Sequence, residues 1–199
     1  MKRLPRSLCS GSAGFAQPAR FAGAEQCSAN SPLHPPEGAP VRLGRPGADG
    51  AVAPILVIGI GNPSRGDDAL GPACIEALQA RLPPGVELLT DFQLQVEHVL
   101  DLAHRRQVVF VDASVGCAGP FSFEDIEADL RLAPLSHALS PAELLGVYRR
   151  VHGSAAPPAL VLAIRGYEFA LGAPMTDPAR ANLQAAVSFL ASQMPAAAA

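Results

Sequence analysis

The stretch PILVIGIGNPSRGDDALGP, residues 54–72, decides the fold class of this chain. Its first seven residues form a nearly continuous run of β-branched residues and leucine, which is typical of a strand covered on both faces. A glycine-rich loop follows. Residues 69–82 then place apolar side chains at helical spacing, with Pro72 near the first turn. A buried strand, a glycine loop and a helix are therefore expected in that order.

Strands and helices alternate along the rest of the sequence. We expect strands at 86–89, 107–112, 121–126 and 160–164, and helices at 96–103, 140–151 and 178–194. This alternation predicts an α/β fold, a three-layer α/β/α sandwich around a mainly parallel, twisted sheet of about five strands. In such sheets, ligands bind at the carboxyl ends of the strands.

The two ends of the chain lack these patterns. Residues 1–53 carry seven prolines and no sustained hydrophobic period. Such a segment buries too little apolar surface to offset the entropy lost on ordering. We therefore expect a disordered Pro/Gly/Ala-rich extension at 1–53, one α/β domain at 54–194 and a frayed tail at 195–199.

The composition excludes several classes of protein. With 199 residues, a net charge of −3, no tryptophan and only two tyrosines, the chain has no basic excess for nucleic acid and few residues for stacking on bases. No apolar run is long enough to cross a membrane. The four cysteines form no C-x-x-C pair, and we expect Cys74 and Cys117 to be buried thiols in a reducing, cytoplasmic compartment.

Acidic residues follow two of the buried strands. Asp67 and Asp68 lie in the glycine loop, and Asp112 ends the run at 107–112. If these first and third strands are neighbours in the sheet, Asp67 or Asp68 can approach Asp112. Capping of the next helix explains Asp67, while structural and functional roles are equally open for Asp112.

The glycine loop does not fit nucleotide binding. The dinucleotide pattern G-x-G-x-x-G fails because Ser64 stands at the third glycine, and the phosphate-binding loop would need a lysine that is absent. Asp67 and Asp68 would also repel a pyrophosphate at this helix N-terminus. Acidic residues there suit the positive helix end and can attract a cation.

One histidine, His137, lies in a loop before a well-capped helix, although an ordinary exposed histidine is the simpler interpretation. Together with Asp68 and Asp112 it would make a site for a borderline divalent metal, Ni, Zn, Fe or Mn. Thr90, Asp91 and Gln93 follow the second strand and are candidates for orienting such ligands, or for a turn. The segment 165–168 after the last strand is a candidate for lining a substrate groove.

The motifs in combination resemble one known family. Gly59-Ile-Gly-Asn62, Gly66-Asp-Asp68, the strand end Val111-Asp-Ala113 and Ser136-His137 before a helix resemble the hydrogenase maturation endopeptidases. The resemblance spans residues 55–192, and residues 91–101 resemble the branch that serves NAD-reducing and related cytoplasmic hydrogenases.

The resemblance implies a function and a set of site residues. It implies an aspartic-type, metal-dependent endopeptidase that removes the C-terminal extension of a hydrogenase large-subunit precursor after nickel insertion. Asp68, Asp112 and His137 would be both catalytic residues and metal ligands. The nickel would arrive on the precursor, although a surrogate divalent metal could bind, and the enzyme would be a cytoplasmic monomer.

Two alternatives remain at this point. The same residues would serve an assembly chaperone that holds the precursor at its nickel without cutting it. A nucleotide-binding α/β protein is a second alternative, against which the broken glycine pattern argues.

Overall fold

The computed structural model describes residues 41–43, 52–131 and 138–194, which lie in the unit Pro36–Ala199. Its strands are β1 (Val41–Leu43), β2 (Ile55–Ile60), β3 (Val86–Asp91), β4 (Gln107–Ser114), β5 (Phe121–Ile126) and β6 (Ala159–Arg165). Its α-helices are α1 (Leu70–Leu78), α2 (Val99–Leu102), α3 (Pro141–His152) and α4 (Asp177–Gln193), and two 3-10 turns, η1 (Gly66–Ala69) and η2 (Val96–His98), precede α1 and α2.

The strands form one twisted sheet in the order β1-β3-β2-β4-β6-β5. The four central strands are parallel, while β1 and β5 run antiparallel at the two edges. Ile58 of β2 pairs with Leu89 of β3 on one side and with Phe110 of β4 on the other. The predicted mainly parallel α/β sheet is confirmed.

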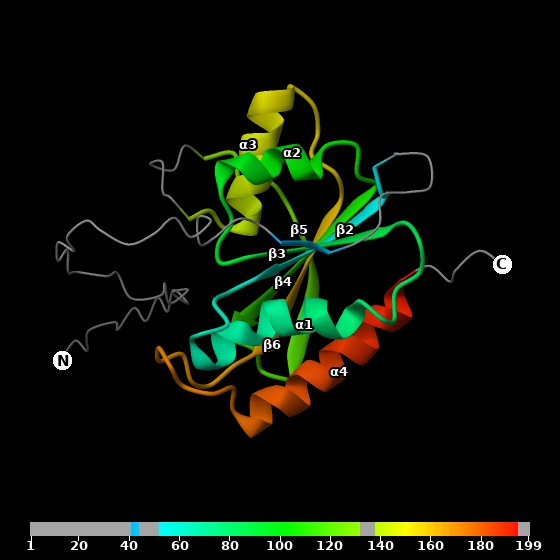
Figure 1. The fold of residues 1–199 in the computed structure, drawn as a ribbon. Coiled ribbons are helices and arrows are strands. Elements are labelled where there is room, and N and C mark those ends of the chain that lie inside the picture. Colours follow the sequence, from blue (N-terminus) through cyan, green and yellow to red (C-terminus); the bar gives the residue numbers. More distant parts are fainter. Residues whose placement is uncertain (1–40, 44–51, 132–137, 195–199) are drawn as a thin grey trace, which may run out of the picture. The chain divides into compact units, whose positions relative to one another are not determined.

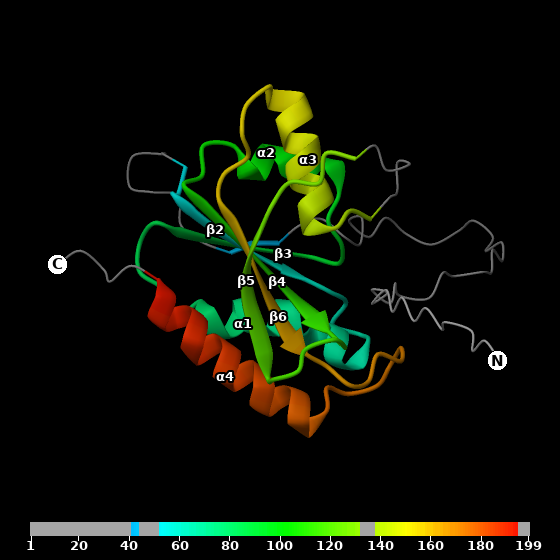
Figure 2. The ribbon, with the colours of Figure 1, turned by 180° about the vertical axis from the view of Figure 1, so that it is seen from behind.

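Helices cover both faces of the sheet. Helices α1 and α4 lie on one face, and α2 and α3 on the other (Figures 1 and 2). Because successive strand residues point to opposite faces, Val57 belongs to the core under α1 and α4, while Leu56 and Ile58 belong to the core under α2 and α3. Full burial of each such side chain contributes about 1.5–3 kcal/mol.

Local signals set the ends of the two long helices. Ser140 caps α3 by accepting a hydrogen bond from Glu143 N, and the Glu143 side chain accepts one from Ser140 N in return. Pro141 occupies the first turn, as the sequence predicts. At α4 the cap is Thr176, whose Oγ1 accepts a hydrogen bond from Ala179 N.

The sheet begins earlier than the sequence analysis places it. Val41–Leu43 pairs with β3 although these residues fall within the expected extension at 1–53. The remainder of that extension lies outside the described residues. Within the described part of the chain, no helix is both long and apolar enough to span a membrane.

Candidate functional site

The carboxyl ends of β2 and β4 lie side by side near the middle of the sheet. Gly59 of β2 is paired with Val111 of β4, so the loop after β2 starts beside Asp112. Asp112 follows the alternation of Val108 and Phe110, which point into the core under α2 and α3. Its side chain therefore points to that face of the sheet. The predicted adjacency of these two strands is confirmed.

Two glycines let the chain after β2 fold back sharply. Gly61 has a φ of 135°, and a Cβ at this position would collide with the backbone oxygen of Asp68. Gly71 in α1 approaches the Ile60 oxygen so closely that it also has no room for a side chain. The loop thus returns Asp68 to the end of β2, where Asp68 Oδ2 accepts a 2.9 Å hydrogen bond from Asn62 N.

Asp68 and Asp112 influence each other electrostatically. Asp112 is only partly exposed, and its Oδ1 accepts a 2.7 Å hydrogen bond from Ala113 N. Burial raises the pKa of Asp112 to about 7, against that hydrogen bond, and the negative charge of Asp68 contributes to the rise. A cation shared by the two carboxylates would relieve their repulsion and favour the ionised form of Asp112.

Asp67 has a structural role, but it does not cap a helix. It is fully buried, and its carboxylate accepts four hydrogen bonds, from Tyr167 N, Glu168 N, Thr176 N and Thr176 Oγ1. Burial by itself would raise the pKa of Asp67, but these hydrogen bonds outweigh it and hold that pKa below its ordinary value. Asp67 therefore fastens the loop after β6 to the glycine loop.

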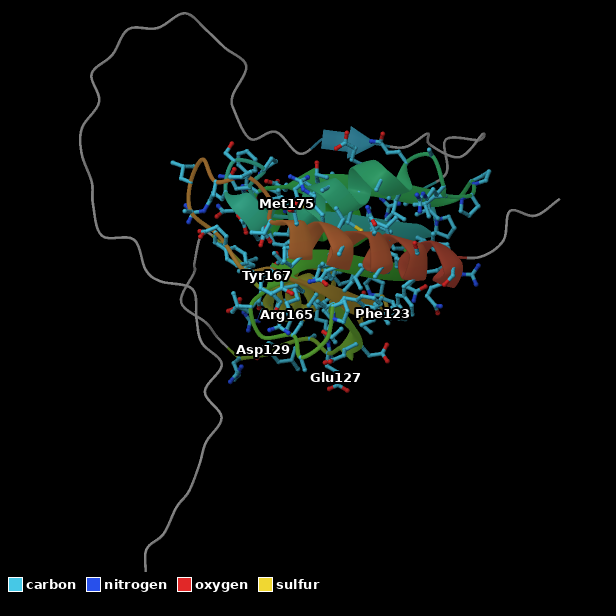
Figure 3. The ribbon with its side chains drawn as sticks, turned by 90° about the horizontal axis from the view of Figure 1, so that it is seen from below. Phe123, Glu127, Asp129, Arg165, Tyr167 and Met175 are labelled. Atoms are coloured by element: carbon cyan, nitrogen blue, oxygen red, sulfur yellow. The ribbon has the colours of Figure 1, made fainter. Side chains whose placement is uncertain are left out.

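Backbone hydrogen bonds join the same two loops. Gly66 N donates to Ala173 O over 3.0 Å, and Gly172 N donates to Ser64 O over 2.7 Å. Arg165 lies over the ring of Tyr167, with its guanidinium carbon 5.3 Å from the ring centre, and Figure 3 shows the two near each other. The segment 165–168, expected to line a substrate groove, thus lies directly against the acidic loop.

His137 lies outside the described residues. Among the residues that the structure describes, no group of three His, Cys, Asp or Glu side chains is placed to hold a metal ion. The nearest described residues that follow His137 reach the same edge of the sheet, because Leu139 N donates a 2.9 Å hydrogen bond to Leu94 O in the loop after β3. His137 therefore remains a predicted third ligand.

A buried acid–imidazole pair also occupies this edge. His98 Nε2 lies 3.3 Å from Asp91 Oδ2, and both side chains are almost completely buried. The sequence predicts that Asp91 orients ligands or forms a turn, and it predicts a helix at 96–103 that includes His98, but it does not predict their contact. A sequence signal for the buried position of His98 is its spacing from Gln95, because the two residues form a reciprocal capping box at η2.

The arrangement leaves little room for a different chemistry. Cys74 and Cys117 are buried, as predicted, and burial raises the pKa of the Cys74 thiol to about 12, so it is a poor nucleophile. The Cys117 thiol donates to Ala163 O over 3.3 Å. In the glycine loop the backbone N–H of Asn62 already donates to the Asp68 carboxylate, which disfavours a bound phosphate.

Comparison with known proteins gives matches among solved structures. No protein-family model and no curated protein matches the chain. The hydrogenase maturating endopeptidase HybD from Escherichia coli is 24% identical with a TM-score of 0.56, over 68% of this chain and 88% of that one. The chain has the fold of the hydrogenase maturation endopeptidases.

Two further structures agree. An endopeptidase from Escherichia coli is 25% identical with a TM-score of 0.53, over 68% of this chain and 88% of its own. The NiFe hydrogenase maturation protease HycI from Thermococcus kodakarensis KOD1 is 21% identical with a TM-score of 0.55, over 70% and 91%. The resemblance to the hydrogenase maturation endopeptidases is confirmed at the level of the fold, while the NAD-reducing branch stays a prediction.

Proposed function

We propose that this chain is a hydrogenase maturation endopeptidase that removes the C-terminal extension of a nickel-containing hydrogenase large-subunit precursor. The observation that carries the proposal is that Asp68 and Asp112 lie close enough at the carboxyl edge of the sheet for the charge of Asp68 to raise the pKa of Asp112. Endopeptidases that act in hydrogenase maturation share this fold. Three motifs of the sequence resemblance, at residues 59–62, 66–68 and 111–113, lie at this edge.

His137 is the third ligand in this proposal. Its support comes from the chain that follows it, since Leu139 is hydrogen-bonded to Leu94 at the same edge of the sheet. Two residues of extended chain span at most about 7 Å. We therefore propose that the imidazole at position 137 reaches the edge of the sheet where Asp68 and Asp112 lie.

In this proposal the nickel belongs to the substrate, because it arrives inside the precursor. Two carboxylates and an imidazole suit Ni²⁺ or a surrogate divalent ion. Such an ion polarises a scissile carbonyl or acidifies a bound water, which accounts for an endopeptidase without a nucleophilic Ser or Cys in any recognisable arrangement.

The residues of the chain prepare the site in distinct ways. The backbone N–H of Asn62 orients the Asp68 carboxylate by donating a hydrogen bond to its Oδ2. Asp112 sits where burial keeps its carboxyl protonated up to about pH 7, so it must release this proton when a cation approaches. The raised pKa thus makes Asp112 a group that changes its charge on meeting a metal-bearing partner.

The partner follows from the reaction. It is the large-subunit precursor, which the chain meets as a cytoplasmic monomer in this proposal. The two buried, unpaired thiols, Cys74 and Cys117, are in keeping with a reducing compartment. A requirement for nickel in the precursor would make the cut conditional on completed metal insertion.

Incubation of the full chain with purified precursor, with and without nickel, tests the proposal. We expect a shortened large subunit only from the nickel-loaded precursor. A stable complex with uncut precursor would instead support an assembly chaperone with the same ligands. Absence of both cutting and binding would reject both functions, and a nucleotide-induced rise in melting temperature would favour the nucleotide-binding alternative.

A further inference from the structure

His98 is a buried histidine in the segment 91–101 that has no part in the proposed ligand set. Only 3% of the residue is exposed, and it lies in η2, between β3 and α2. Resting on the proposed function, we propose that His98 is a positioning residue for peptide-bond cleavage, acting through Asp91 and the turn that joins them.

The hydrogen bonds of His98 define its ring orientation. Gln95 N points at Nδ1 over 3.0 Å, so Nδ1 is the acceptor of the neutral ring, although Gln95 O also lies 3.2 Å away. The ring hydrogen is then on Nε2, which faces Asp91 Oδ2 at 3.3 Å. The His98 imidazole therefore links Asp91, the last residue of β3, to Gln95, the N-cap of η2.

This pair is a poor device for stability alone. In the described part of the chain, His98 Nε2 is the one buried side-chain nitrogen or oxygen that meets no full hydrogen-bond geometry. Buried polar pairs with imperfect geometry contribute less to stability than apolar residues of similar size. Their best-supported use is to fix one arrangement out of several.

The turn at residues 91–98 is hydrogen-bonded to two segments that border the candidate site. Asp91 O accepts a 3.1 Å hydrogen bond from Gly61 N, at the start of the loop that carries Asp68. Leu94 O accepts the hydrogen bond from Leu139 N, just before α3. Residues 91–98 thus connect the glycine loop to the residues just before α3. The buried His98 side chain holds the two ends of this turn together.

Four variants test the role of His98. His98→Leu removes the bridge with a side chain that suits a buried position, Asp91→Asn removes the charge, and the double variant combines them. His104→Asn is the matched control, because His104 is exposed and has a φ of 64°, which asparagine tolerates. The readouts are kcat and KM for nickel-loaded precursor, and hydrogen exchange at the Gly61 and Leu139 amides.

We expect His98→Leu to remain folded and to lower kcat by about tenfold to a hundredfold with little change in KM, because a misplaced site slows the chemical step. Asp91→Asn should show a similar loss, and the double variant should be no slower than the slower single variant. Exchange at Gly61 and Leu139 should accelerate in His98→Leu, and His104→Asn should match the wild type.

Three results would overturn the role of His98. They are wild-type kcat in folded His98→Leu, losses that multiply in the double variant, and unchanged exchange at both amides. The proposed function fails separately, when the wild-type chain does not shorten the precursor. Hydrogen exchange in His98→Leu then still decides whether this histidine orders the turn.

Discussion

Asp67 and Asp112 are two carboxylates at the same edge of the sheet with opposite environments. Asp67 is fully buried and accepts four hydrogen bonds from the loop after β6, which hold its pKa below the ordinary value although burial opposes this. Asp112 accepts one from Ala113, and burial together with the charge of Asp68 raises its pKa to about 7.

The number of hydrogen-bond donors around each carboxylate distinguishes the structural Asp67 from the proposed reactive Asp112. A carboxylate with a full set of donors is stable as an anion and has little capacity left for a ligand. A carboxylate with one donor and an acidic neighbour gains most from a cation. On this basis we assign Asp67 to the fold, and Asp68 with Asp112 to the proposed chemistry.

The largest expected effect is on the proposed chemistry. Asp68→Ala, Asp112→Ala and His137→Ala should each lower the rate of precursor shortening by about a thousandfold, because a lost metal contact removes several kcal/mol of transition-state stabilisation. The measurement is a time course of the shortened subunit, with circular dichroism showing that each variant is folded. Full processing by all three variants would reject the site.

The next effect should fall on stability instead. Asp67→Ala leaves the partly buried backbone donors of Tyr167, Glu168 and Thr176 without their charged acceptor, at about 1–3 kcal/mol each. We expect a loss of at least about 3 kcal/mol in the free energy of unfolding, measured with urea, and a smaller loss in Asp67→Asn, which keeps one acceptor oxygen.

The pH dependence of the Asp67 contribution follows from the direction of its pKa shift. Because the folded-state pKa is lowered from 3.8, the stabilisation is complete above this value and disappears as the pH falls through the folded-state pKa. The difference between wild type and Asp67→Asn should therefore shrink in acid. An equal difference at all pH values would remove the contrast with Asp112.

Asp112→Asn should give a moderate effect of opposite sign. The folded-state pKa of about 7 lies above 3.8, so ionised Asp112 costs stability, increasingly from pH 4 to 7 and constantly above. In metal-free protein at pH 8, Asp112→Asn should thus raise the free energy of unfolding by at least about 1 kcal/mol, and by almost nothing at pH 3.5. Thermal unfolding at the two pH values measures this. Destabilisation at pH 8 would contradict it.

The smallest effect is expected at the edge strand β1. Deletion of residues 1–40 keeps β1, whereas deletion of residues 1–50 removes it and leaves β3 unpaired on that side. We expect unchanged processing in both truncated chains, and a loss below about 1 kcal/mol in the second, since β1 has only three residues and pairs with one strand. Loss of processing would give the N-terminal segment a role in the reaction.

The central architecture could be predicted because its signals are local. The apolar runs that became β2 and β4 need no knowledge of the rest of the chain, and the Ser140 cap of α3 is visible within four residues. Strand β1 escaped prediction because its short sequence lies among prolines and glycines, and only pairing with β3, more than forty residues away, gives it structure.

The site was predicted in part for the same reason. The approach of Asp68 to Asp112 follows from strand order, which the alternation of elements indicates. The anchoring role of Asp67 could not be predicted, because its partners lie 100, 101 and 109 residues away. The contact of His98 with Asp91 was not predicted, because only the folding of the segment between β3 and η2 brings the two side chains together.

The most direct test of the central claim is a titration of the side-chain carboxyl carbons of Asp67 and Asp112 by NMR in the metal-free chain. The account predicts that Asp112 titrates near pH 7, at a lower pH in Asp68→Asn, and that Asp67 titrates below its ordinary value of 3.8. An Asp112 carboxyl that titrates near 4 and does not respond to Asp68→Asn would contradict the pairing of the two acids.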